Sequence, residues 1–262
     1  MRFENLTLEV KDGLARLTLN RPKAANSFNL DLTREFLEAA TICADDSAIR
    51  AVLLTGAGRF FSAGGDLKNF AAAKDQIPKL VSETADALHA AISKLARMNA
   101  PIVAAVNGPA AGAGMSVVCM TDIALAAESA FFSMAYTAAG LAPDGSSTYF
   151  LPRIVGIRRA RELMLSNRRL SAAEAHAWGI VERVVPDDDL MAEAEKLARA
   201  LASGPTLAFG AVKKLLLASQ NAQLEDQLDA ETNAIVSMTR TSDGREGVAA
   251  FREKRKPSFK GA

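Results

Sequence analysis

Two apolar segments of the chain are each followed directly by a loop of small residues and then by a helix-type pattern. Residues 51–55 precede the loop 56–66, and residues 102–106 precede the loop 107–114. Strands that are joined through helices run parallel, and their following loops meet at one edge of the sheet. This order predicts an α/β fold with functional loops at the strand ends. The residues themselves do not repeat, so the pattern defines no solenoid.

The rest of the first two thirds of the chain predicts further strands and helices. Residues 14–20 alternate apolar and polar side chains after a turn at 11–13, which is typical of the second strand of a hairpin. Apolar residues at helical spacing after Asn29, a candidate N-cap, predict a helix there. The other expected elements are strands at 5–10, 123–126 and 131–134 and a helix at 78–98.

From Ser171 onwards the pattern is helical. Ser171 and Glu174 form the two ends of a capping box, and Gly179 is placed to end that helix. Further helices are expected at 188–203, 205–219, 221–240 and 243–254. A shift in composition at Gly204-Pro205 predicts a boundary between a core of residues 1–204 and a helical region of residues 205–262.

Charge and cysteine content disfavour several classes of protein. The 31 basic and 30 acidic side chains give a formal net charge of +1, without the field that nucleic-acid binding exploits. The chain shows no signal-peptide pattern and no apolar run of about 18 residues, so we expect no membrane partner. Cys43 and Cys119 lie in apolar settings far apart, which favours buried thiols and a cytoplasmic location.

Common catalytic motifs are missing from the sequence. There is no G-x-S-x-G, P-loop or dinucleotide fingerprint, and His89 and His176 lack the spacing of metal ligands, so we expect no metal and structural or surface roles for both. What remains is the two small-residue loops and the turn Pro143-Asp144-Gly145. Amides from the two loops could converge as an oxyanion hole, or the glycines could serve only tight packing. The residues alone leave both interpretations open.

The loops and the segments around them resemble the enoyl-CoA hydratase/isomerase (crotonase) family. The segments that carry the resemblance are Arg21-Pro22 with Asn26, residues 61–67, 106–114, 122–123, 140–143 and 245–251, and Lys254-Arg255. The resemblance implies a crotonase-type spiral of ββα units, followed by C-terminal helices that assemble homotrimers or dimers of trimers. It also implies an acyl-CoA thioester as the substrate, with no additional cofactor.

The same resemblance assigns a binding site. The backbone N–H groups of Gly65 and Ala113 are expected to bind the thioester oxygen, with alanine standing where the family more often has glycine. The other residues expected to contact CoA or substrate are Lys23, Ala25, Ala63, Asp66, Leu67, Lys68 and Tyr136. Phe251 and Lys254 are expected to reach the CoA of the same or an adjoining subunit.

The reaction is narrowed by the residues at the family's catalytic positions. Where the hydratases carry two glutamates, this chain has Ser116 and Tyr136, and neither is a carboxylate base at neutral pH. Asp144 stands where several isomerases of the family place a catalytic carboxylate. Pro-Asp-Gly is also a common turn sequence, so Asp144 could serve only the turn. Because both glutamates are missing, we favour a catalytic role for Asp144. We therefore expect an isomerase that shifts a double bond, or isomerises a ring epoxide, through a thioester enolate, with Asp144 as acid and base.

Within the family, the motifs are most similar to the epoxyphenylacetyl-CoA isomerases of phenylacetate catabolism and the Δ3-Δ2 enoyl-CoA isomerases. Three alternatives remain. Asp144 could be a nucleophile, as in the family's aryl-CoA dehalogenases. Those enzymes look to have a tryptophan where this chain has Tyr136, which disfavours this alternative. A differently recruited water could support hydratase activity. A non-catalytic homologue could bind RNA through residues 254–256 and Lys260.

Overall fold

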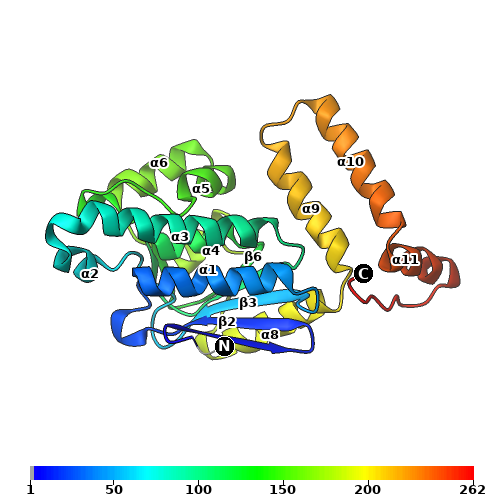
Figure 1. Cartoon of the computed structure of the whole chain (residues 1–262), viewed down its shortest axis with the longest axis horizontal. Coiled ribbons are helices and arrows are strands. Elements are labelled where there is room, and N and C mark those ends of the chain that lie inside the picture. Colours follow the sequence, from blue (N-terminus) through cyan, green and yellow to red (C-terminus); the bar gives the residue numbers. More distant parts are fainter. Residues whose placement is uncertain (1–2) are drawn as a thin grey trace.

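A hairpin begins a sheet in which all later strands run parallel (Figure 1). The computed structural model describes residues 3–262. The hairpin turn passes through Gly13 at a φ of +78°, a left-handed conformation that suits glycine. The strands, in their spatial order, are β1 (Leu6–Lys11), β2 (Leu14–Leu19), β3 (Ala51–Gly56), β4 (Ile102–Val106), β6 (Ile123–Ala127) and β9 (Arg183–Val185).

The chain also forms a second sheet, of three strands. Its strands are β5 (Ala110–Ala111), β7 (Phe131–Ser133) and β8 (Leu170–Ser171). β4, β5 and α4 (Ala113–Met120) follow one another, and β6 and β7 repeat the strand pair, so successive turns of chain add one strand to each sheet. The α/β spiral expected from the sequence is confirmed.

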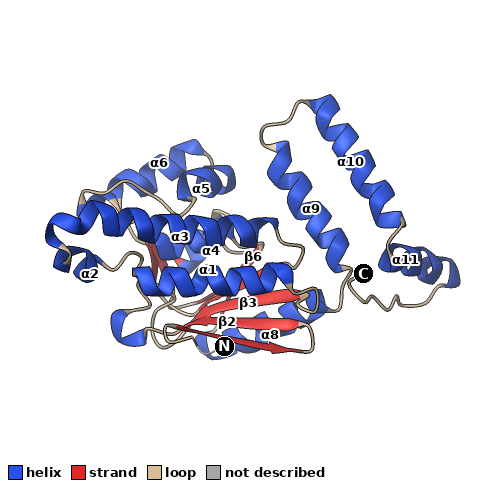
Figure 2. Cartoon of the chain, in the orientation of Figure 1, coloured by secondary structure: helices blue, strands red, loops and turns tan. Residues whose placement is uncertain are grey.

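Helices cover the large sheet (Figure 2). α1 (Leu30–Asp45) packs against α3 (Ile77–Arg97), and α8 (Leu190–Ala202) packs on β3 and β4. Both strands are buried along their whole length, as parallel strands are when both faces are covered. α1 begins where the sequence predicted, because Asn29 Oδ1 accepts a hydrogen bond from the Leu32 amide at 3.0 Å.

Three helices were not predicted from the sequence. They are α2 (Leu67–Ala72), α5 (Ser147–Val155) and α6 (Ile157–Ser166). α5 lacks the usual signals, since Ser146 before it has a φ of +66° with no side-chain cap and Pro152 lies inside it. The packing of α5 against α4 and α6 therefore stabilises a segment with weak local preference for a helix.

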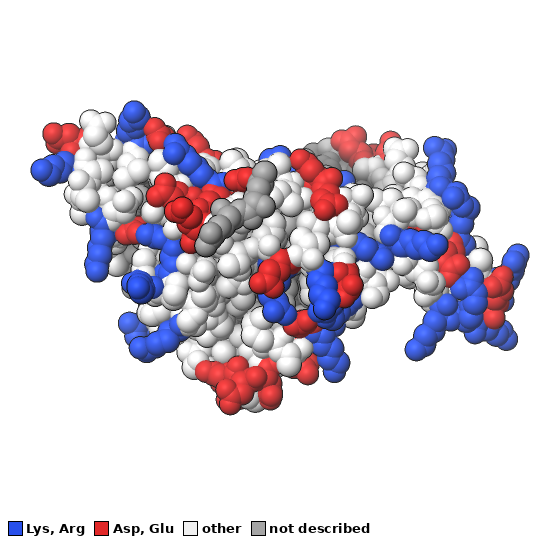
Figure 3. Space-filling model, turned by 60° about the horizontal axis from the view of Figure 1, so that its bottom comes forward, with Lys and Arg blue, Asp and Glu red and all other residues white. Residues whose placement is uncertain are grey.

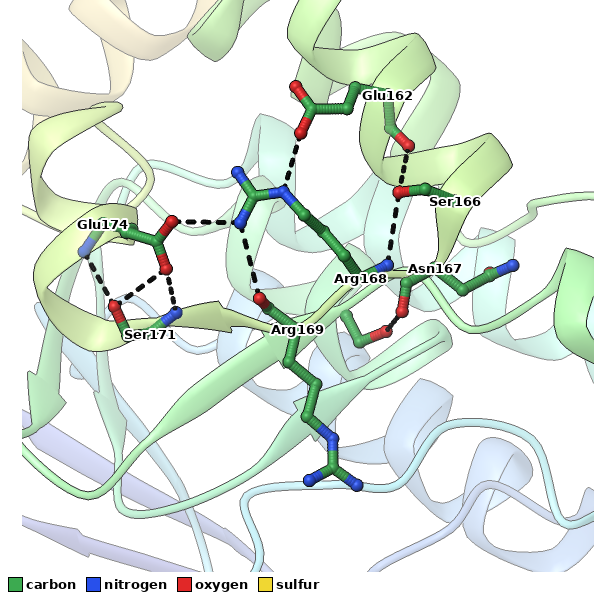
Figure 4. A network of polar contacts seen from close by, with 8 residues as sticks. Glu162, Ser166, Asn167, Arg168, Arg169, Ser171 and Glu174 are labelled. Carbon is green, nitrogen blue, oxygen red and sulfur yellow. Dashed lines mark hydrogen bonds and ion pairs between the residues drawn. The ribbon is translucent and has the colours of Figure 1, made fainter.

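Arg168 fastens the end of α6 to the start of α7 (Ala172–Ala177) (Figure 4). Its guanidinium pairs with Glu162 at 2.7 Å and with Glu174 at 3.0 Å. The Ser171 hydroxyl accepts from the Glu174 amide at 3.2 Å, and the Glu174 carboxylate accepts from the Ser171 amide at 3.0 Å. The predicted capping box is thus confirmed, and it fixes β8 between two helices.

The last three helices are α9 (Thr206–Ser219), α10 (Leu224–Thr239) and α11 (Ser242–Glu253), and they extend away from the sheets (Figure 1). α9 is tied to the core by Lys213, whose side chain is 8% exposed and lies 2.7 Å from Asp122. Its ammonium also donates to the carbonyl oxygens of Leu95 and Ala100, at 3.2 and 3.1 Å. Burial lowers the pKa of Lys213, and the Asp122 charge opposes this shift. The C-terminal helices are confirmed, while the boundary at residue 204 remains a prediction.

None of the helices within residues 3–262 has the length and apolarity needed to cross a membrane. Cys43 and Cys119 are buried free thiols. Burial raises the pKa of each to about 12, and the nearby Asp46 adds to the shift of Cys43. Both cysteines are therefore protonated at neutral pH and unreactive as nucleophiles.

The buried contact of Lys213 gives a stability prediction. Lys213→Met removes the buried cation beside the Asp122 carboxylate and a donor to two carbonyl groups, although the Ile102 amide still donates to Asp122, so we expect the free energy of unfolding to fall by about 2–3 kcal/mol. Lys214→Met is the matched control, because Lys214 is exposed and, within residues 3–262, its ammonium bonds only Asn99, at 2.9 Å. Urea unfolding at one protein concentration measures both. Equal losses in the two variants would contradict the assigned role of Lys213.

Candidate active site

Asn26 holds the first small-residue loop in place. It is completely buried. Its Oδ1 accepts from the Arg21 amide at 2.9 Å, and its Nδ2 donates to the carbonyl oxygens of Ala57 and Phe60 at 2.9 and 2.7 Å. A buried amide with these partners satisfies three backbone groups that no strand or helix pairs. Asn26 therefore fixes the path of the loop before its glycines are reached.

The two small-residue loops lie directly against each other. The Ala111 amide donates to the Ser62 carbonyl at 2.9 Å. Gly64 has a φ of +91°, and a Cβ placed there would lie 2.8 Å from the carbonyl oxygen of Ala111 and 3.2 Å from the amide nitrogen of Ala113. Only glycine permits this approach. The contact brings Gly65, the next residue, beside the start of α4.

Two backbone amides at this junction are free to bind a ligand. Within residues 3–262, the N–H groups of Gly65 and Ala113 have no intramolecular acceptor. Ala113 is the first residue of α4, where amides lie unpaired and carry partial positive charge. The strained position is Gly112, with a φ of +51°, whereas Ala113 has ordinary helical backbone that suits alanine. The two amides provide the donors that an oxyanion hole requires.

Asp144 is bound by a chain of hydroxyl groups. Tyr136 Oη donates to Asp144 Oδ1 at 2.7 Å. Ser116 Oγ, on the buried helix α4, lies 3.0 Å from Tyr136 Oη. Burial and the adjacent Asp144 charge raise the pKa of the Tyr136 phenol, so this hydroxyl keeps its proton. The hydroxyl groups of Ser116 and Tyr136 thus form a hydrogen-bonded chain that ends at the Asp144 carboxylate.

The turn that carries Asp144 is held from two sides. Gly145 has a φ of +58°, and a Cβ there would lie 3.0 Å from the Cβ of Ser116. The Gly145 amide donates to Nε2 of His89 at 3.0 Å, and the Ser147 hydroxyl donates to the Asp144 carbonyl at 2.9 Å. His89 was expected to have a structural or surface role, and its observed contact is structural. Its position beside the carboxylate had no signal in the sequence.

Asp144 opens into a cavity of about 580 Å³. The cavity lies among α3, α5, the start of the Asp144 turn and the end of α9, and within residues 3–262 Asp144 is its one carboxylate. Its lining includes His89, Arg97, Thr148, Tyr149, Phe150 and Leu217. No group of acidic, histidine or cysteine side chains in this range could hold a metal ion. A second cavity, of about 520 Å³ beneath α9, contains none of the predicted site residues.

The residues expected near CoA are gathered around the first loop. The Ala63 amide donates to the Ala25 carbonyl at 2.9 Å, which joins the two segments. Lys23 and Lys68 are exposed on either side, on the turn at 22–24 and on α2, and Leu67 is also exposed. These five residues therefore lie together around the first loop.

Asp66 has a structural role that the sequence did not suggest. Its carboxylate lies 3.1 Å from the Arg21 guanidinium and also accepts from the Asn69 amide at 3.1 Å. The first contact ties the loop to the segment before Asn26, and the second caps α2. The side chain is 12% exposed. Asp66 thus fixes the loop geometry around Gly65.

Phe251 and Lys254 are not brought to this site within one chain. They lie on and just after α11, at the opposite end of the molecule from α2 (Figure 1). Phe251 is 87% exposed. Basic side chains gather at this end in Figure 3, with acidic side chains among them. Arg255, for example, pairs with both Glu246 and Glu253, at 2.6 and 2.8 Å.

Comparisons with known proteins show which family the chain belongs to. A profile of the enoyl-CoA hydratase/isomerase family matches residues 9–262. The 1,2-epoxyphenylacetyl-CoA isomerase of Escherichia coli is 40% identical over 99% of both chains. A 4-chlorobenzoyl coenzyme A dehalogenase of an Arthrobacter species is 36% identical over 95% of this chain and 91% of its own. The crystal structure of an enoyl-CoA hydratase from Bacillus anthracis, 34% identical, superposes with a TM-score of 0.91 over 99% of this chain and 100% of that one. The chain belongs to the enoyl-CoA hydratase/isomerase family.

Proposed function

We propose that this protein is an acyl-CoA isomerase that uses Asp144 as both base and acid. One observation carries the proposal: Asp144 is the single carboxylate of its cavity in the described chain, and the groups that lead to it, Tyr136 and then Ser116, are hydroxyls at the positions where the family's hydratases carry glutamates. The family's hydratases add water with two glutamates, and this chain has neither. Moving a proton between two carbons needs only one carboxylate.

The chemistry follows from a carboxylate and two amides. Asp144 removes a proton from the carbon chain next to the thioester, and the resulting negative charge spreads to the thioester oxygen. The N–H groups of Gly65 and Ala113 bind that oxygen, and one such donor contributes about 3 kcal/mol to transition-state stability. Asp144 then returns the proton at the far end of the allylic system, which moves the double bond. An enolate formed beside an epoxide could rearrange the ring in the same pocket.

The acyl-CoA is proposed to lie with its thioester between the two loops and its CoA portion along the first loop. Lys23 and Lys68 flank that path and would meet the phosphates. The relatives support CoA thioesters as the substrate class, and the E. coli relative supports epoxyphenylacetyl-CoA as one candidate. The buried free thiols are consistent with our assignment to the cytoplasm.

Substitution of Asp144 tests the base directly. We expect Asp144→Asn to reduce kcat for a 3-enoyl-CoA or epoxyphenylacetyl-CoA by about 100-fold or more while the CoA product binds normally. Asp188→Asn, an exposed change outside the cavity, is the control. The assay compares both substrates with a 2-enoyl-CoA. Near-normal turnover, water addition to the 2-enoyl-CoA as the main reaction, or an aryl-aspartate trapped with a chlorobenzoyl-CoA would each overturn the isomerase assignment.

The Ala113 amide can be removed without interrupting α4. Proline is favoured at the first position of a helix, so Ala113→Pro deletes the N–H while keeping the helix. We expect kcat/KM to fall by about 100- to 1,000-fold, as for a lost oxyanion donor. Ala113→Gly retains the N–H and is expected to lose far less. Circular dichroism and steady-state kinetics of the two variants check the prediction, which fails if both lose activity equally.

We also propose that the chain assembles as a homotrimer or a dimer of trimers. Apolar side chains on the outer helices are exposed in one chain, namely Val212, Leu216, Leu224, Leu228, Ile235 and Val236. Such faces are covered in stable proteins. Assembly would also let Phe251 and Lys254 reach the ligand of another subunit, which one chain does not allow.

Light scattering measures the assembly. We expect the mass of three or six copies of the 27.7 kDa chain. Ile235→Asp places a charge in the proposed interface and should release smaller species, whereas Asp188→Asn should not. A monomeric wild-type protein would contradict the proposed assembly.

A further inference from the structure

The hydroxyl chain at Asp144 does not end at Ser116. Ser116 Oγ also lies 3.1 Å from the carbonyl oxygen of Gly112, to which it can donate. That carbonyl belongs to the same peptide group as the Ala113 N–H. A continuous path therefore runs from the carboxylate of Asp144 through two hydroxyl groups to the amide that would bind the thioester oxygen.

Counting hydrogens shows that the path has two arrangements. Tyr136 has one hydroxyl proton, which it donates to Asp144. Ser116 has one hydroxyl proton and two acceptors in reach, Tyr136 Oη at 3.0 Å and the Gly112 carbonyl at 3.1 Å. Ser116 can donate to only one of them at a time. The Gly112 carbonyl oxygen can accept this second hydrogen bond, because among the described residues its one other donor is the Ser116 amide, at 3.0 Å.

The charge on Asp144 selects between these arrangements. While Asp144 is ionised, the Tyr136 hydroxyl is strongly polarised, and a chain in which Ser116 donates to Tyr136 is strengthened cooperatively. Once Asp144 is protonated it is a weaker acceptor, so the cooperative strengthening of the Ser116–Tyr136 hydrogen bond falls. The Ser116 hydroxyl then donates to the Gly112 carbonyl oxygen instead. An added hydrogen bond on that carbonyl polarises the peptide group and makes the Ala113 N–H a better donor.

We propose that Tyr136 and Ser116 are positioning residues that couple the protonation of Asp144 to the donor strength of the Ala113 amide. The inference rests on the proposed function. Asp144 becomes protonated at the step that places negative charge on the thioester oxygen, so the amide strengthens when that charge appears. No proton passes along the chain; only the direction of the Ser116 O–H bond changes.

The carbonyl stretch of a bound thioester reports the donor strength. The probe is a 2-enoyl-CoA labelled with ¹³C at the thioester carbonyl, bound to the full-length protein and followed by difference infrared spectroscopy as a function of pH. In the wild type we expect the band to move to lower frequency as the pH falls through the midpoint of the acid limb of the pH–rate profile. His89 on α3 and Arg97 also face this region and titrate or carry charge, so variants must separate their effects.

Two variants are expected to shift the band in opposite directions. In Tyr136→Phe, Ser116 donates to Gly112 permanently, so the band stays at the low frequency at every pH. In Ser116→Ala that bond is lost, so the band stays at the high frequency. Ser133→Ala, which removes another buried hydroxyl outside the chain, should retain the wild-type shift.

The outcomes separate this inference from the proposed function. A pH-independent band in the wild type, or the same displacement in both variants, would overturn the coupling even if Asp144→Asn is inactive as an isomerase. Failure of the wild type to bind the thioester, or full turnover in Asp144→Asn, would instead overturn the proposed function. Retention of the pH-dependent shift by Ser116→Ala would assign the response to another group and contradict the proposal.

Discussion

The close approach of Gly64 to the Gly112–Ala113 peptide is the contact on which the site depends. A single methyl group at residue 64 would lie within 3.2 Å of the Ala113 nitrogen, so the chain must have glycine there. Asn26 and the Arg21–Asp66 pair hold one side of the contact, and the start of α4 forms the other. The buried polar groups around the first loop thus hold in place two amides, those of Gly65 and Ala113, that have no partner within the described chain.

The spiral explains how Asp144, from a later part of the chain, comes to lie beside the helix that carries one of those amides. The second turn of the spiral supplies α4, and the third supplies the segment from Tyr136 to Gly145. Gly145 packs on Ser116, so the Asp144 turn rests on the same helix that presents the Ala113 amide. Ala135 and Ser146, at φ values of +53° and +66°, occupy the left-handed region at either end of this segment. Backbone strain of this kind persists where surrounding packing fixes the conformation, and it is common at active sites.

Much of this arrangement could be predicted from the sequence, and the remainder could not for physical reasons. The strands β1 to β4, β6 and β7, the cap at Asn29 and the capping box at Ser171 have local signals in the residue pattern, whereas the short strands β5, β8 and β9 were not predicted. α5 was missed because Pro152 and the uncapped start at Ser146 disfavour a helix locally, whereas tertiary packing stabilises it. The roles expected for Gly65, Ala113 and Asp144 come from the family resemblance and remain predictions. The His89–Gly145 contact and the Arg21–Asp66 pair join residues far apart in sequence, and the Tyr136–Asp144 bond closes an irregular segment of no fixed spacing, so no residue pattern reveals them.

The central claim is that one carboxylate removes a proton from one carbon and returns it to another. A 3-enoyl-CoA deuterated at carbon 2, converted by the wild-type protein and analysed by NMR and mass spectrometry, tests it most directly. If Asp144 carries the proton, a measurable fraction of the deuterium appears at carbon 4 of the 2-enoyl product, and none does so with Asp144→Asn. Complete loss of deuterium to solvent, together with oxygen from labelled water in the product, would contradict the account.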